Sequence, residues 1–262
     1  MHFYAKPGDD VPCNLCCAAF RFCEALLSIS TPKPRQMALS AELVARVHRD
    51  LTDEGPDPGL TYHDDADYAA ITADMLAQKP AGSACWLFAY GSLIWKPEIP
   101  HVAEMRGTAR GWHRSFCFRV TRFRGTRAEP GLMMALDRGG QCGGMLYRLG
   151  NDDLPGQVNK LFRREFTVKP PNCRPRWITV ATAEGTVPAI AFVMNRAAKA
   201  YAGKLSPDEV ADVLSYSCGH WGPGAEYLYH TVAHLEAKGI HDRHLWQLQE
   251  LVAQKIAART SS

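Results

Sequence analysis

The stretch Phe88-Ala-Tyr-Gly-Ser-Leu-Ile-Trp95 decides the fold, because a buried strand runs into a glycine and then carries polar and aromatic side chains out of the core. The apolar run 86–90 predicts that strand. Gly91 allows the backbone to approach a ligand closely, and N–H groups freed at such a strand end can form a nest for a carboxylate. A strand followed by an ordinary tight turn explains the same residues, and the pattern leaves both interpretations open.

Further strands are predicted from this stretch up to about residue 196. Trp112, Phe116, Phe118 and Val120 lie at even spacing, which is the period-2 signature of a strand. The glycine-rich segment 139–144 fits neither a dinucleotide-binding nor a phosphate-binding pattern, so it predicts a hairpin turn. The other strand candidates are 132–136, 144–149, 177–182 and 189–195.

Helical patterns flank these strands at both ends. Ser40 can cap a helix that extends to Leu51, and Ser206-Pro-Asp-Glu209 is a capping box with proline in the first turn. Together the elements predict an α+β fold, in which a compact sheet or barrel is surrounded by helices and has helical N- and C-terminal flanks. The other helices are predicted from Tyr68 to Leu76 and at 154–166, 225–238 and 242–258.

Glu165 is the candidate catalytic residue on the helix predicted at 154–166. Val158, Leu161 and Phe162 form the buried stripe of this helix, and Glu165 falls on the same stripe. Burial disfavours the charged form of a carboxylate and raises its pKa toward the working pH, which a general base needs. A glutamate at a helix end that reaches solvent or pairs with an arginine is the alternative, which the pattern leaves open.

Composition and charge exclude several classes of function. With 30 basic and 27 acidic side chains the formal net charge is +3, too even a balance to indicate a nucleic-acid partner. The longest apolar runs, such as 187–194, fall short of the roughly 20 residues that a membrane-spanning helix needs. Arg21 and Glu24 interrupt the one apolar patch near the N-terminus, so no secretory signal is predicted. We therefore expect a cytoplasmic protein with reduced thiols and no membrane partner.

Residues 1–36 differ from the rest of the chain and are predicted to be a cysteine-containing extension, with a single domain at 37–262. They hold four of the nine cysteines, namely Cys13, Cys16, Cys17 and Cys23. These could ligate zinc, but the second half of a standard cysteine and histidine spacing is missing, so we predict no metal site.

Two other motifs have simpler explanations. His230 and His234 have the helical spacing of a zinc motif, but Thr231 stands where that motif has its general-base glutamate. Packing or solvent exposure is therefore the favoured interpretation of both histidines. Ser92 lacks the second glycine of a nucleophile elbow, which argues against a serine hydrolase.

Several segments resemble, in chain order, the motifs of ChaC-like γ-glutamylcyclotransferases. The similarity spans about residues 38–256. The segments that carry it are Phe88-Ala-Tyr-Gly-Ser-Leu-Ile-Trp-Lys-Pro97, Gly111-Trp-His-Arg114, Phe116-Cys117, Arg124-Gly-Thr126, Pro130-Gly-Leu132 and Arg164-Glu165, with Cys218-Gly-His-Trp-Gly222 and Glu226-Tyr-Leu-Tyr229 resembling the longer bacterial branch.

The resemblance implies a small mixed β-barrel with helices around it and a reaction that needs no cofactor and no metal. It implies a small-molecule substrate, glutathione, which is split into 5-oxoproline and Cys-Gly. Glu165 matches the family's catalytic acid and base. The turn after the first barrel strand is implied to hold the γ-glutamyl end of the substrate, through Tyr90, Gly91, Ser92, Leu93, Ile94 and Trp95.

Two departures from the family pattern leave the selectivity open. Arg127 stands where many relatives have proline, and Phe166-Thr-Val-Lys-Pro-Pro171 replaces a Gly-Gly-Tyr stretch of the eukaryotic-type enzymes. A cyclotransferase for another γ-glutamyl amine or amino acid is therefore an alternative. A non-catalytic regulator of cation transport is a second alternative, although such a protein would not need a glutamate in an apolar stripe.

Overall fold

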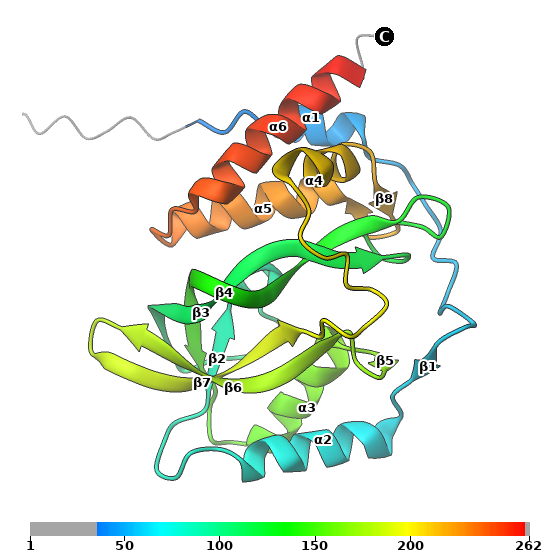
Figure 1. The fold of residues 1–262 in the computed structure, drawn as a ribbon. Helices are drawn as coiled ribbons and strands as arrows, with labels where there is room; N and C mark the ends of the chain where they lie inside the picture. The colour runs from blue at the N-terminus through cyan, green and yellow to red at the C-terminus, as the bar shows by residue number, and fades with distance from the viewer. Residues whose placement is uncertain (1–35, 260–262) are drawn as a thin grey trace, which may run out of the picture. The chain divides into compact units, whose positions relative to one another are not determined.

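Two long antiparallel strands, β3 (Ala103–Val120) and β4 (Gly131–Arg148), form the central hairpin of the fold (Figure 1). The structure is a computed structural model and describes residues 36–259. Three further strands close the sheet into a barrel of order β2-β4-β3-β6-β7: β2 (Trp86–Ala89), β6 (Cys173–Thr182) and β7 (Gly185–Met194). Because β2 runs antiparallel to β4 but parallel to β7, the barrel is mixed. The predicted α+β fold with a small mixed barrel is confirmed.

The hairpin turn predicted at 139–144 is wrong. Strand β4 continues through this segment, and the β3–β4 register shifts between Arg110 and Trp112, opposite Gly139 and Gly140. Both glycines have positive φ angles, 103° and 68°, which side-chain-bearing residues rarely adopt. The glycines therefore make a bulge that bends one long strand around the barrel, instead of ending it.

Helix α3 (Leu154–Glu165) places the candidate catalytic residue at its last position. Asp153 caps the helix by accepting a hydrogen bond from the Gly156 amide at 3.1 Å. Its stripe of Val158, Leu161 and Phe162 is fully buried, as predicted. The chain beyond α3 is held by α2 (Asp65–Ala77), because the Tyr68 hydroxyl donates a hydrogen bond to the Phe166 carbonyl at 2.9 Å.

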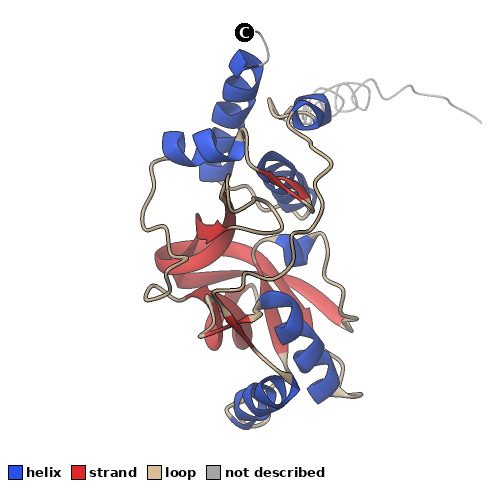
Figure 2. Cartoon of the chain, turned by 90° about the vertical axis from the view of Figure 1, so that its right-hand side faces the viewer, coloured by secondary structure: helices blue, strands red, loops and turns tan. Residues whose placement is uncertain are grey.

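The remaining helices gather at one end of the barrel, whereas α2 and α3 lie at the other (Figures 1 and 2). They are α1 (Ala41–Arg46), α4 (Pro207–Leu214), α5 (Gly224–Ala237) and α6 (Arg243–Arg259). Ser40 caps α1 and the capping box of Ser206 and Glu209 starts α4, both as predicted. Helix α1 ends at Arg46 and leaves Leu51 outside, so it is shorter than predicted.

Short elements complete the fold. Strand β1 (Thr61–Tyr62) pairs with β5 (Val168–Lys169), and β8 (Cys218–Gly219) pairs with β9 (Gly222–Pro223). Within residues 36–259, no helix combines the length and the apolar character that a bilayer crossing needs. Residues 1–35 of the predicted extension, which include its cysteine cluster, lie outside the described residues, so both stay predictions.

Candidate active site

A cavity of about 580 Å³ lies beside the turn that follows β2. Glu165 lines it together with Tyr90, Gly91, Ser92, Leu93 and Trp95 from the predicted turn. The fold thus brings the candidate acid of α3 and the turn after β2 to one cavity, although about 70 residues separate them in the sequence. Ile94 differs from its neighbours, because it is buried in the hydrophobic core and does not line this cavity.

The turn is built from backbone hydrogen bonds around Gly91. The Ile94 amide donates to the Gly91 carbonyl at 2.9 Å, and the short helix η1 (Ser92–Ile94) follows. The Tyr227 hydroxyl of α5 packs directly on Gly91, since a Cβ at this position would lie 2.9 Å from that oxygen. Glycine is therefore required here for close approach rather than for an unusual φ angle.

Tyr90 fixes the start of the turn in the barrel. Its hydroxyl donates a hydrogen bond of 2.7 Å to the Phe192 carbonyl of β7. Its own carbonyl accepts from Arg114 Nε at 3.1 Å. The Arg114 guanidinium is buried and also pairs with Asp242 at 2.5 Å, just before α6. Arg114 thus ties the turn to the C-terminal helices, which explains a motif residue to which the sequence analysis gave no role.

Glu165 is a carboxylic acid in an apolar setting. Only 18% of its side chain is exposed, and burial raises its pKa from 4.5 to about 7. Arg164 opposes this rise, with its Nε 3.1 Å from Glu165 Oε1. The negative charge of Glu98 contributes to the rise. At neutral pH the carboxyl group can therefore both accept and donate a proton, as an acid–base catalyst must.

Three other titratable groups near Glu165, namely Tyr227, Tyr90 and Cys173, stay neutral. Burial and, to a smaller extent, the negative charge of Glu165 raise the pKa of Tyr227 to about 12. Burial, helped by the same charge, also raises the pKa values of Tyr90 and Cys173. Two phenols and a thiol, all of them protonated, thus lie near the Glu165 carboxyl group. Glu165 is the group among them whose pKa lies near neutrality.

The family model described as ChaC-like protein matches residues 85–255. The chain belongs to the ChaC-like family. The glutathione-specific γ-glutamylcyclotransferase of Escherichia coli (strain K12) is 35% identical over 191 residues, which cover 72% of this chain and 81% of the relative. The γ-glutamylcyclotransferase 2-3 of Arabidopsis thaliana is 26% identical over 178 residues, covering 64% and 88%.

A solved structure has the same fold. The crystal structure of the yeast γ-glutamylcyclotransferase specific to glutathione has a TM-score of 0.60 at 21% identity, covering 66% of this chain and 97% of that one. At this identity the likeness concerns the fold. The family resemblance that the sequence motifs indicated is confirmed, and so is the barrel architecture that it implied.

Arg124, the first residue of the ChaC-like motif Arg124-Gly-Thr126, also lines the cavity. Arg124 is buried, donates to the Pro223 carbonyl at 3.2 Å and forms an ion pair with Glu226. Gly125 lies against Gly131, because a Cβ on Gly125 would come within 2.2 Å of the Gly131 amide nitrogen. The sequence motifs contained Arg124 and Glu226, but no local pattern indicated the ion pair between them, which joins residues about 100 positions apart.

The histidines that had metal-like spacing pack against the turn. His230 and His234 both lie beside Trp95, with ring centroids 5.3 and 6.4 Å from it. The Trp95 indole donates to Thr231 Oγ1 at 3.4 Å, and His234 Nδ1 lies 2.7 Å from the His230 carbonyl. These contacts give both side chains a structural role as the support of Trp95, which lines the cavity.

Proposed function

We propose that this ChaC-like protein is a glutathione-specific γ-glutamylcyclotransferase, which converts glutathione into 5-oxoproline and Cys-Gly. The observation that carries the proposal is the buried Glu165 carboxyl, with a pKa of about 7, in the same cavity as the turn from Tyr90 to Trp95. The relative in Escherichia coli that is named for this activity supports the choice of glutathione.

The proposed reaction is an intramolecular aminolysis. The α-amine of the γ-glutamyl group attacks its own γ-carbonyl carbon and closes a five-membered lactam, while the bond to the cysteinyl nitrogen breaks. Because the nucleophile is part of the substrate, much of the rate advantage comes from holding the γ-glutamyl chain in a folded conformation. The cavity beside Gly91 is the place where the protein would impose that fold.

Glu165 would carry both proton transfers. As a carboxylate it accepts the proton that the attacking amine loses, and as a carboxylic acid it donates that proton to the departing cysteinyl nitrogen. The group returns to its starting state at the end of each turnover, so every step uses the substrate and this side chain alone. The proposal accordingly includes neither a metal nor another cofactor.

The turn from Tyr90 to Trp95 would hold the γ-glutamyl end. Gly91 and its neighbours in the turn line the cavity, and the protonated phenols of Tyr90 and Tyr227 lie near Glu165. We place the reaction in the cytoplasm, where thiols are kept reduced. The five cysteines among the described residues are free thiols, in accord with that location.

The test is to incubate the purified protein with glutathione and to quantify the products. We expect 5-oxoproline and Cys-Gly in equal amounts and no free glutamate. A panel of γ-glutamyl amino acids measures how strict the selectivity is, and faster turnover of another γ-glutamyl compound would replace glutathione as the substrate. Absence of 5-oxoproline from every γ-glutamyl compound would overturn the proposal and favour a non-catalytic regulator.

A further inference from the structure

A second lobe of about 340 Å³ adjoins the cavity and shares Glu165 with it. Glu165 and Arg164 line both lobes, and so do Cys173 and Trp221. The turn residues from Tyr90 to Trp95 line only the first lobe. The acid thus stands where the two lobes meet. If the γ-glutamyl group occupies the first lobe, the amide bond that breaks lies at Glu165 and the leaving amine extends into the second lobe.

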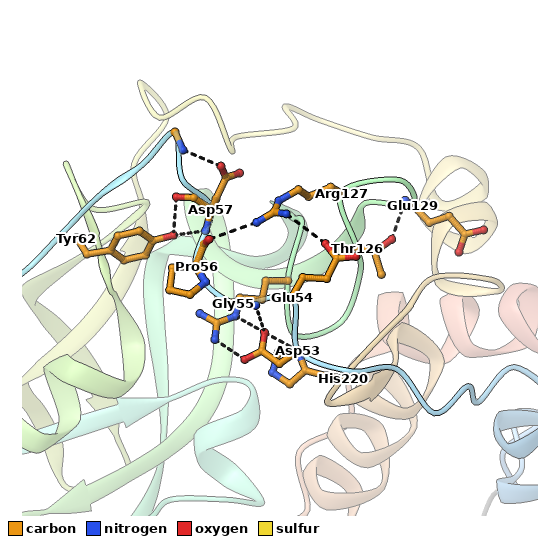
Figure 3. Close-up of polar contacts among 12 residues, drawn as sticks. Asp53, Glu54, Gly55, Pro56, Asp57, Tyr62, Thr126, Arg127, Glu129 and His220 are labelled. Atoms are coloured by element: carbon orange, nitrogen blue, oxygen red, sulfur yellow. Dashed lines mark hydrogen bonds and ion pairs between the residues drawn. The ribbon is translucent and has the colours of Figure 1, made fainter.

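The outer wall of the second lobe comes from a connector, residues 53–62, that precedes the family-model match. Figure 3 shows how the barrel side holds this connector. Arg122 Nε donates to Asp53 Oδ1 at 2.7 Å, and Arg127 Nη2 donates to the Pro56 carbonyl at 3.3 Å. Arg127, the residue that departs from the family pattern, therefore holds this wall in place.

The connector is also closed upon itself and against the C-terminal part of the chain. The Asp57 amide donates to the Tyr62 hydroxyl at 2.7 Å. His220 Nδ1 lies 3.5 Å from Asp53 Oδ1. These contacts hold Asp57, Leu60 and Tyr62 along the second lobe, so its outer wall is tied to the rest of the protein at several points.

Two cations of the second lobe have no partner among the described residues. Arg119 and Lys199 both line it, and the hydrogen bonds and ion pairs within residues 36–259 include none to either side chain. Their chain segments are adjacent, because the Arg119 amide donates to the Ala200 carbonyl at 2.9 Å. The other cations of the lobe are occupied, Arg122 by Asp53 and Arg164 by Glu165.

The second lobe also exposes large apolar side chains. Leu60 is 46% exposed and Trp221 is 53% exposed, and both line this lobe. Trp221 is held in place by Phe123, whose ring centroid is 4.2 Å away. Exposed apolar surface at the rim of a cavity is typical of a ligand-binding surface. The lobe therefore combines an aromatic wall with the positive charges of Arg119 and Lys199.

We infer that the second lobe is the leaving-group subsite and that it selects γ-glutamyl compounds whose amine part ends in a carboxylate. In glutathione this is the glycyl carboxylate, which Arg119 and Lys199 bind while the Cys-Gly chain lies against Trp221. Charge-assisted hydrogen bonds to a carboxylate are among the strongest that side chains form. The inference rests on the proposed function, and it adds which residues recognise the leaving group.

The test compares glutathione with its C-terminal carboxamide, which lacks only the negative charge of the glycyl end. The wild-type protein should have a kcat/KM at least about tenfold higher for glutathione. In the variant Arg119→Met/Lys199→Met this ratio should fall to near 1. Arg176→Met is the matched control, because it removes an exposed arginine that lines neither lobe, and it should keep the wild-type ratio.

The outcomes of this test distinguish a failure of the subsite inference from a failure of the proposed function. A wild-type protein that turns over both compounds at equal kcat/KM, or a double variant that keeps the wild-type ratio, would overturn the subsite and leave the proposed function standing. A wild-type protein that forms no 5-oxoproline from either compound or from any other γ-glutamyl amide would overturn the proposed function, and the subsite with it. Thermal melting of each variant shows that the comparison is made on folded protein.

Discussion

The Tyr227 hydroxyl occupies the space that a side chain at Gly91 would need, since a Cβ there would lie 2.9 Å from that oxygen. The two residues come from different parts of the fold, Gly91 from the turn after β2 and Tyr227 from α5. Because the phenol also lies close enough to Glu165 for the two groups to interact electrostatically, this contact links the turn that we propose to hold the substrate to the proposed acid. Any change in the contact should therefore alter activity more than stability.

Gly91→Ala should lower kcat/KM for glutathione by about 10- to 100-fold, because a shift of about 1 Å in a positioning group can cost that much. The added methyl must displace the Tyr227 hydroxyl or the turn. In Gly91→Ala/Tyr227→Phe the clash is gone, so the methyl should cost less in the Tyr227→Phe background than in the wild-type one. Steady-state kinetics of the four proteins measure this coupling, and strict additivity would contradict the proposed contact.

The pH dependence of kcat/KM should report the carboxyl group of Glu165. Activity should rise with pH through a midpoint near its pKa of about 7, since the base acts in its deprotonated form. Arg164→Met should move the midpoint to higher pH by removing a positive charge that lowers this pKa. Glu98→Gln should move it to lower pH by removing a negative charge that raises it.

Arg163→Met is the control for the Arg164 variant, because Arg163 pairs with Asp65 at 2.7 Å and lies over the Tyr68 ring. Its replacement should leave the midpoint where the wild-type protein has it. Shifts of the same sign for Arg164→Met and Glu98→Gln would show that another group controls the profile.

Burial of Glu165 should also appear in the pH dependence of stability. A carboxyl whose pKa is 4.5 when unfolded and about 7 when folded binds more protons in the native state, so stability is lost as pH rises from 4.5 to 7. The loss amounts to about 3 kcal/mol for a shift of this size. The side chain in the Glu165→Gln variant cannot ionise, so this variant should not show that loss of stability.

Urea unfolding of the wild-type protein and Glu165→Gln at pH 4.5 and pH 8 measures this difference. The Gln variant should gain stability relative to wild type by about 3 kcal/mol between the two pH values. An equal pH dependence for both proteins would mean that the carboxyl group is not desolvated as the structure indicates.

The backbones at Gly125 and Gly131 approach each other so closely that a side chain at either position should destabilise the fold. A Cβ on Gly131 would lie 2.2 Å from the Arg124 carbonyl oxygen, a backbone atom that cannot move aside cheaply. Gly131→Ala should therefore lower the free energy of unfolding by at least about 2 kcal/mol. Gly59→Ala is a matched control, because the nearest atom to its Cβ would be 3.5 Å away. Similar stability of the two variants in urea unfolding would contradict this role.

Local patterns predicted the parts of the fold that depend on local interactions. The stripe of Val158, Leu161 and Phe162 gave helix α3 and the inward position of Glu165, because a period of 3.6 residues decides which side chains share a face. The capping residues Ser40 and Ser206 were predicted for a similar reason, since a cap bonds within three residues of itself. In these places the deciding interaction lies within one turn of helix.

What the sequence could not show depends on contacts between distant segments. Arg114 pairs with Asp242 and Arg124 with Glu226 across more than 100 residues, and no local periodicity indicates such pairs. The glycines at 139 and 140 were mistaken for a hairpin turn because a bulge and a turn use the same residues. The second lobe was also hidden, since the connector at 53–62 reaches it only in the folded chain.

The rate of 5-oxoproline formation from glutathione by Glu165→Gln, measured beside the wild-type protein, tests the central claim most directly. Gln keeps the size of the side chain but cannot accept the proton of the attacking amine. The account predicts a loss of about 1,000-fold or more at neutral pH in a variant that melts no lower than wild type. A Gln variant within about tenfold of the wild-type rate would contradict it, because a general base of this importance cannot be dispensed with.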